Sequence, residues 1–84
     1  MNFERGKDPK RSLNIGLGFN LVIMRMRLPN GRKFKDYLLY DKDLNLVKIG
    51  TSNRGKEKAY YNYIYFLRSL NIDPKDVTIH KMEK

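Results

Sequence analysis

The sequence has 84 residues, and this length predicts one domain, since single domains rarely divide below about 150 residues. A hydrophobic share of 40% together with six glycines gives an apolar share of about 47%, which is that of an ordinary globular chain and argues against disorder. No cysteine is present, which excludes disulfides and thiolate chemistry, and no apolar run is long enough to cross a membrane. Because such a composition fits a reducing compartment, we expect a cytoplasmic protein that has no contact with a membrane.

The charge of the chain is strongly positive. Lysine and arginine number 18 against 9 acidic residues, so the formal net charge is +9. Solubility of a small domain needs a net charge of only roughly 2–8. A more basic surface attracts polyanions, and nucleic acid is the polyanion that gains most from lysine and arginine, through release of counterions from its phosphates.

The chain opens with residues 1–7, a polar and basic stretch that we interpret as a flexible arm. Asp8 and Pro9 then predict the N-cap and first position of a short helix that ends near residue 14. Residues 19–28 predict a strand whose even positions are all apolar, while the odd positions begin apolar and end in Arg25 and Arg27.

The sequence Pro29-Asn30-Gly31 predicts a three-residue hairpin loop, and a second strand follows over residues 32–40. A third strand is predicted over 46–50, then a long amphipathic helix over 54–70 that Asn71 can end in the left-handed conformation, and a last strand over 77–82. The predicted fold is therefore a single α+β domain over residues 8–84. Its antiparallel three-stranded meander and C-terminal strand are packed by the long helix and the short N-terminal one, in the order α-β-β-β-α-β.

The hairpin is the first candidate site. A three-residue loop sets Arg27 opposite Lys33 and Arg25 opposite Lys35 on one face, with Arg32 beside the turn. Like charges directly opposite each other destabilise a strand pair, and a phosphate reverses that repulsion. These five residues are the predicted nucleic-acid-binding set. The alternative is a solvated edge whose cations prevent aggregation between strands.

The predicted long helix carries the second candidate site. Opposite its apolar side, a helical wheel places Tyr61 and Tyr65 on one line between Lys58 and Arg68. Exposed tyrosines among cations stack on unpaired bases or form hot spots of protein interfaces. The further alternative is that the tyrosines are buried beneath the N-terminal helix.

Catalytic chemistry has little support in this sequence. His80 is the sole histidine, and the carboxylates fall mostly in turns and caps, so neither a metal site nor a catalytic triad is predicted. We expect a binding protein that uses no cofactor and is not an enzyme.

Two functions remain open at this point. The favoured one is nucleic-acid binding, to DNA or RNA, through the cationic hairpin, which a ribosome-associated accessory protein would share. The alternative is a small regulator or inhibitor, of the kind that phages and mobile elements encode, that binds an acidic protein through the tyrosine face. The chain is expected to be a monomer or a weak dimer.

Overall fold

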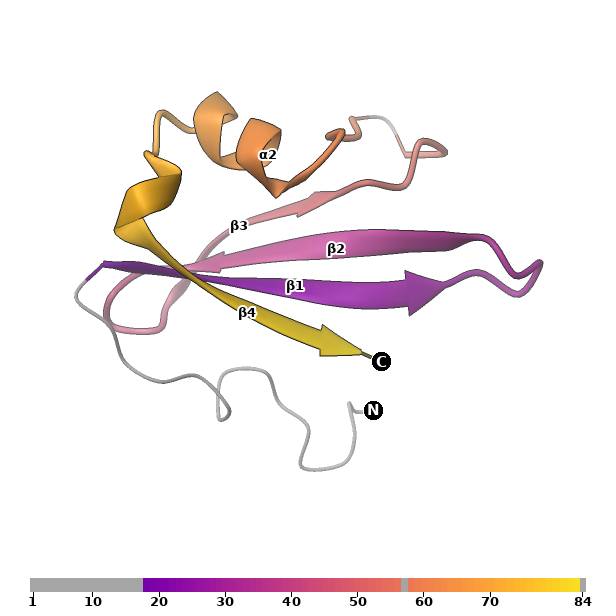
Figure 1. Cartoon of the computed structure of the whole chain (residues 1–84), viewed down its shortest axis with the longest axis horizontal. Helices are drawn as coiled ribbons and strands as arrows, with labels where there is room; N and C mark the ends of the chain where they lie inside the picture. The colour runs from indigo at the N-terminus through magenta and orange to yellow at the C-terminus, as the bar shows by residue number, and fades with distance from the viewer. Residues whose placement is uncertain (1–17, 57, 84) are drawn as a thin grey trace.

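The computed structural model of the protein (Figure 1) describes residues 18–56 and 58–83. Its elements in chain order are β1 (Phe19–Arg27), β2 (Lys33–Tyr40), β3 (Leu46–Thr51), α2 (Tyr63–Ser69), the 3₁₀ turn η1 (Pro74–Asp76) and β4 (Val77–Glu83). Each strand lies within one residue of its predicted bounds. The predicted arm (1–7) and the predicted short helix (8–14) lie outside the described residues.

The sheet is mixed, and the prediction of an antiparallel sheet is wrong. Its strand order is β3-β2-β1-β4, with β4 parallel to β1 and the other pairs antiparallel. The reason is the connection after β3, in which α2 carries the chain back across the sheet to the end where β3 began. A strand that follows such a crossover runs parallel to the strand before it. β4 therefore pairs with β1 in the same direction.

The predicted long helix is also wrong, because α2 begins only at Tyr63. The side chain of Asn62 accepts hydrogen bonds from the backbone N–H groups of Ile64 and Tyr65, at 2.9 and 3.3 Å, and so caps the helix. Asparagine offers the backbone this alternative to helical hydrogen bonding, which is why it favours a helix start over a helix interior.

Residues 52–56 and 58–61 form a connection instead of the first turns of that helix. Asn53 Oδ1 accepts from the N–H of Gly55 at 2.9 Å, and the N–H of Tyr60 donates to the carbonyl of Thr51 at 2.9 Å. The backbone N–H groups of Gly55 and Tyr60 are thus used in a turn and in a bond to the end of β3, and not in helical hydrogen bonds. The end of α2 is as predicted, since Asn71 has the left-handed φ of 60°.

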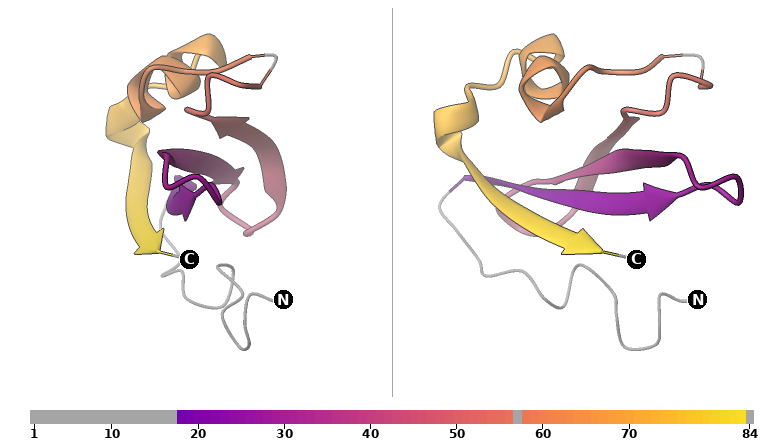
Figure 2. Two further views of the ribbon diagram at one scale, coloured as in Figure 1. Left: turned by 90° about the vertical axis from the view of Figure 1, so that its right-hand side faces the viewer. Right: turned by 45° about the vertical axis from the view of Figure 1, so that its right-hand side comes forward.

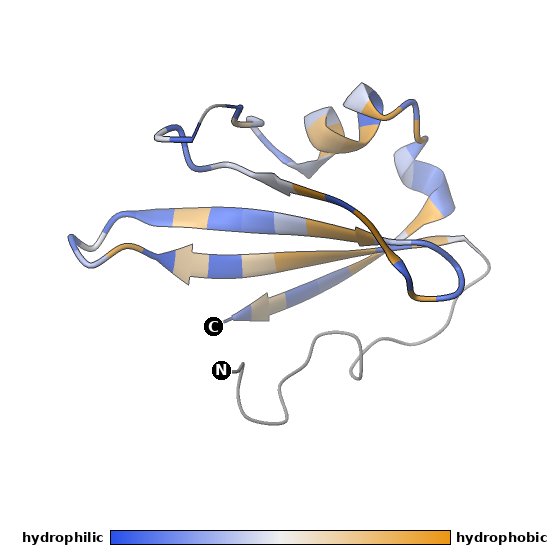
Figure 3. Ribbon diagram, turned by 180° about the vertical axis from the view of Figure 1, so that it is seen from behind, coloured by the Kyte–Doolittle hydropathy of each residue, from blue (hydrophilic) through white to orange (hydrophobic). Residues whose placement is uncertain are grey.

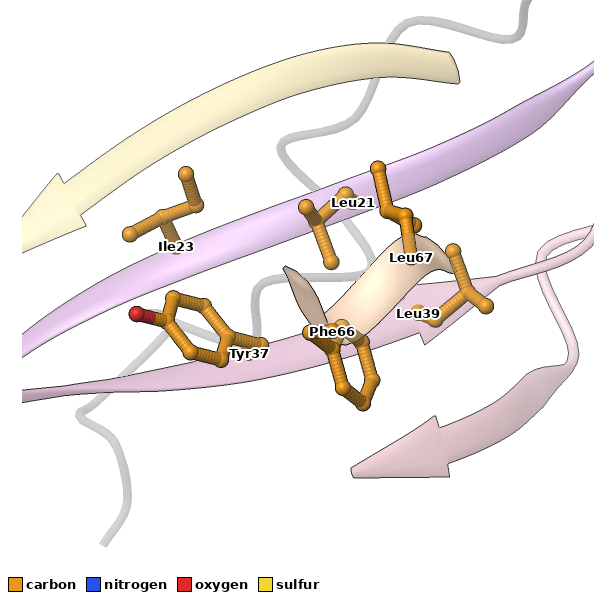
Figure 4. Packing of buried hydrophobic residues seen from close by; sticks show 6 residues of the cluster. All are labelled: Leu21, Ile23, Tyr37, Leu39, Phe66 and Leu67. Carbon is orange, nitrogen blue, oxygen red and sulfur yellow. The ribbon is translucent and has the colours of Figure 1, made fainter. Parts of the chain in front are cut away.

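The main core lies between α2 and one face of the sheet (Figures 2 and 4). It contains Leu21, Ile23, Tyr37, Leu39, Phe66 and Leu67. The ring of Phe66 stacks on Tyr37 at 5.6 Å between centroids and meets Tyr60 edge-on at 5.2 Å. Gly50 makes this approach possible, because a Cβ on it would lie 2.5 Å from Phe66 Cδ1. α2 therefore packs against β3 at Gly50, where only a residue without a side chain leaves room for the ring of Phe66.

The opposite face of the sheet holds a smaller apolar cluster, in which Val22, Met24 and Tyr40 are buried. Asn20 is fully buried in the same layer, and its Oδ1 lies 3.2 Å from His80 Nε2. Both faces of β1 are thus buried along its first half. Figure 3 shows the ribbon turning from mostly hydrophobic there to mostly hydrophilic toward the hairpin. The hairpin extends beyond the helix (Figure 1), and its cations Arg25, Arg27, Lys33 and Lys35 are exposed.

Candidate nucleic-acid interface

The β1–β2 hairpin has the register that its loop length predicts. Arg25 faces Lys35 and Arg27 faces Lys33. The N–H of Leu28 donates to the Arg32 carbonyl at 2.8 Å, and Gly31 accommodates the turn with a φ of 89°. All five predicted cations (Arg25, Arg27, Arg32, Lys33 and Lys35) are exposed. The structure thus brings the two cross-strand pairs together on one ribbon.

The period of two along β1 decides which face the pairs occupy. Leu21 and Ile23 lie on the face that α2 covers, and Arg25 and Arg27 continue along that same face beyond the helix. The cations therefore lie on the same face of the sheet as the helix, on the part of the hairpin that the helix does not cover. The same face of this alternating strand is thus buried core in its first half and exposed, charged surface in its second half.

The end of β3 fixes the position of one cation. The N–H of Lys35 donates to Ser52 Oγ at 2.7 Å, and the Lys35 carbonyl accepts from the N–H of Ser52 at 2.8 Å. Burial raises the pKa of Tyr37 above its ordinary 10.0, and the neighbouring Ser52 side chain opposes this effect only in part. Tyr37 is therefore a neutral phenol at physiological pH, and Figure 4 shows its hydroxyl directed away from Phe66.

A hollow of about 570 Å³ lies over these residues. Its lining includes the four paired cations together with Tyr37, Ser52, Tyr61 and Glu83. A second hollow, of about 510 Å³, shares Arg25, Lys35, Tyr37 and Glu83 with the first and adds Asn62, Tyr63 and Lys81. We call the two together the basic groove. Its floor is the hairpin, and its walls are the residues before and at the start of α2 and the end of β4.

Glu83 is the acidic residue of the groove, and sequence reasoning missed it. It pairs with Arg25 in the parallel β1–β4 register, and its Oε2 lies 3.5 Å from Arg25 Nη1. Both side chains are largely exposed, at 72% and 66%, so the ion pair itself adds little stability. The signal that could have found Glu83 was the helical crossover before β4, which makes β4 a neighbour of β1.

Arg54 is a second residue that the sequence reading missed, since it was assigned to the long helix. A small hollow of about 160 Å³ at the base of the hairpin loop is lined by Arg32, Lys33 and Arg54, among others. Arg54 follows the Ser52 and Asn53 turn, and that turn directs the chain past the hairpin. The cationic surface therefore continues from the groove toward the hairpin tip.

The second predicted site is only partly assembled. Tyr61 and Tyr65 do contact each other, edge to face at 5.9 Å between centroids, and are 75% and 54% exposed. Lys58 and Tyr61 precede α2, so the predicted helical stripe does not form. Lys58 Nζ lies instead 5.7 Å from the centroid of the Tyr60 ring. Arg68 is exposed in the last turn of the helix.

Tyr61 thus belongs to both predicted sites. It is the tyrosine that lines the basic groove beside the cations, and its ring is held by Tyr65 from the helix. The sequence placed the hairpin and the tyrosines in two separate candidate sites. The structure unites them through this one residue.

Within residues 18–56 and 58–83, no three histidine or acidic side chains gather to form a candidate metal site. None of the helices there has the length and apolar character that crossing a membrane requires. Comparison of the chain with protein-family models, with curated proteins and with solved structures finds no match.

Proposed function

We propose that this protein is a non-enzymatic nucleic-acid-binding protein whose basic groove holds the phosphate backbone. The observation that carries the proposal is the pairing of Arg25 with Lys35 and of Arg27 with Lys33 on one exposed ribbon. Each like-charge pair destabilises the free hairpin by roughly 0.2–1 kcal/mol. A bound phosphate between the members of a pair converts that repulsion into attraction.

The kinds of cation support phosphate as the anion. Arginine presents a planar fork of donors that grips phosphate oxygens in a bidentate manner, while lysine acts as a point charge. β1 supplies two arginines and β2 supplies two lysines opposite them, so both modes of contact are available at each pair. Arg32 and Arg54 extend the same surface along a polyanion that is longer than one phosphate.

The test is the salt dependence of binding. Fluorescence anisotropy with labelled DNA and RNA, between about 50 and 200 mM salt, should give an affinity that falls steeply. Replacing Arg25 and Arg27 by alanine should weaken binding to all sequences and reduce the log–log salt slope by about 2, one for each phosphate contact. The matched control replaces the exposed Lys42 and Lys75, which lie outside the groove. A flat salt dependence would contradict the proposal.

A second candidate is a small regulator or inhibitor that binds an acidic protein. The observation in its favour is that Tyr65 and Arg68 are exposed on the helix and do not line the groove. Tyrosine and arginine are enriched in interface hot spots, and the basic charge would speed the encounter. Under this alternative, Tyr65→Ala with Arg68→Ala abolishes capture of the acidic partner, while Arg25→Ala with Arg27→Ala only slows it. For both candidates a cytoplasmic location stays our expectation from the cysteine-free sequence.

A further inference from the structure

We infer that the basic groove takes a single strand, with an unpaired base that stacks on Tyr61 and presents its edge to Glu83. This inference rests on the proposed nucleic-acid binding and adds the form of the nucleic acid and the kind of base. Two residues carry it, the exposed ring of Tyr61 and the carboxylate of Glu83, which line the same hollow as the four paired cations. Binding of phosphates alone would require neither of them.

Tyr61 is the stacking platform. A tyrosine that is 75% exposed leaves most of its ring in water, and Tyr65 braces it edge-on at 5.9 Å. With this exposure, part of the ring surface stays available for a base. Single-strand binders combine such rings with a charged groove that follows the backbone, and Tyr61 shares its hollow with Arg25 and Lys35.

Glu83 argues for a base rather than a further phosphate. A carboxylate repels phosphate, yet this one lies 3.5 Å from Arg25 and lines both hollows of the groove. Carboxylates accept hydrogen bonds from exocyclic amino groups, such as N4 of cytosine. In a duplex the Watson–Crick edge is already paired, whereas in a single strand it is free for a protein to bond.

The size of the groove agrees with this reading. Its two hollows, of about 570 and 510 Å³, lie within the range of roughly 300–1,000 Å³ of pockets that enclose small ligands. Ser52 lines the first hollow and Asn62 the second, and they add a hydroxyl and an amide to the cations. The surface is therefore a recess with mixed polar chemistry, which suits a base and its sugar better than the convex side of a duplex.

The experiment measures affinities of the full chain, by fluorescence anisotropy at about 50 mM salt, for three labelled probes. The probes are oligo-dC and oligo-dT, each of about 12 nucleotides, and a mixed-sequence duplex of the same length. We expect oligo-dC to bind most tightly. Tyr61→Ala should weaken oligo-dC by roughly 5- to 100-fold, while Tyr61→Phe retains binding because the ring is kept. Unchanged far-ultraviolet circular dichroism of each variant serves as the folding control.

Glu83→Ala tests the second contact, because it removes the accepting oxygens together with the charge, whereas glutamine would keep a carbonyl acceptor. Removing the negative charge should strengthen oligo-dT binding, since less repulsion opposes the phosphates, and should bring oligo-dC and oligo-dT to similar affinities. If both probes gain by the same factor, Glu83 does not accept from the base and the inference is overturned. If the duplex binds as tightly as the single strands and Tyr61→Ala changes nothing, the inference is overturned while the proposed function stands. If neither these three probes nor an oligo-rC of the same length binds, both fail.

Discussion

Ser52 and Lys35 exchange two backbone-directed hydrogen bonds across the end of the β2–β3 pair. The N–H of Lys35 donates to Ser52 Oγ at 2.7 Å, and the N–H of Ser52 donates to the Lys35 carbonyl at 2.8 Å. The serine hydroxyl thereby continues the ladder past Thr51, the last residue of β3. One side chain outside the strands thus fixes the backbone of a cation in the groove.

Replacing Ser52 by alanine should lower the free energy of unfolding by roughly 0.5–1.5 kcal/mol, because the N–H of Lys35 loses its acceptor. Urea denaturation measures this loss. Ser69→Ala is the matched control, because the hydroxyl of Ser69 donates only to the Phe66 carbonyl of its own helix at 2.7 Å. That control should be close to neutral, since alanine favours helix. Equal losses of stability in the two variants would show that the hydrogen bond between Ser52 and Lys35 stabilises the fold no more than that of Ser69 does.

Gly50→Ala should destabilise the protein by roughly 1–3 kcal/mol, as overpacking of a filled core does. The added Cβ would lie 2.5 Å from Phe66 Cδ1 and 3.3 Å from Tyr60 Cε2, so both rings must move. Gly55→Ala is the control, where the nearest atom is the side-chain Oδ1 of Asn53 at 3.2 Å. Thermal unfolding of both variants checks the prediction, and a Gly50→Ala protein as stable as the parent would contradict the packing described here.

Lys33→Glu should change stability and binding in opposite directions. In the free protein it replaces a like-charge pair with Arg27 by an attractive one, for a gain of roughly 0.2–1 kcal/mol in the free energy of unfolding. In the complex it removes a phosphate contact and adds repulsion, so affinity for nucleic acid should fall. Lys75→Glu, on η1, makes the same charge change outside the groove. A Lys33→Glu protein that is less stable, or binds unchanged, would refute the assignment.

Asp41 provides a pH-dependent prediction. Its Oδ1 accepts from the N–H groups of Asn45 and Asp43, both at 2.9 Å, and these bonds, chiefly that of Asn45, hold its pKa below the ordinary 3.8. The folded state therefore favours the carboxylate more than the unfolded state does. This stabilisation is complete above the unfolded value and is lost as the pH falls through the folded value.

Asp41→Asn should remove that part of the acid sensitivity. Urea midpoints recorded from neutral pH downward compare the variant with the parent, and the difference between them should shrink once the pH lies below the folded pKa. Asp43→Asn is a neighbouring control, because Asp43 contributes its backbone N–H rather than its carboxylate. A constant difference at every pH would contradict the role of the Asp41 charge.

The local features of this fold could be predicted from the sequence. The alternation from Phe19 to Arg27 and the length of the Pro29-Asn30-Gly31 loop gave the hairpin register, because strand period and turn length act between near neighbours. The left-handed stop at Asn71 is equally local.

The predictions failed where two local structures compete for the same backbone groups, or where residues far apart in the sequence meet. A helical pattern over residues 54–70 was overridden where Asn62 captured the N–H groups of the first turn. The sequence predicted only the hairpin side of the groove, because Tyr61 and Glu83, which line the same hollow as Arg25, lie far from it along the chain. Their proximity follows from the crossover, and periodicity within one strand carries no information about it.

The parallel pairing of β4 with β1 also sets the order in which the groove is completed during folding. The hairpin closes over a three-residue loop, an event of roughly 1–10 μs, whereas β4 must return to β1 across the whole intervening chain. We therefore expect the cations to be assembled first and Glu83 to join them only when β4 docks against β1. Under the proposed function, a partly folded chain would already attract phosphates indiscriminately, and the carboxylate that opposes this attraction would arrive with the last strand.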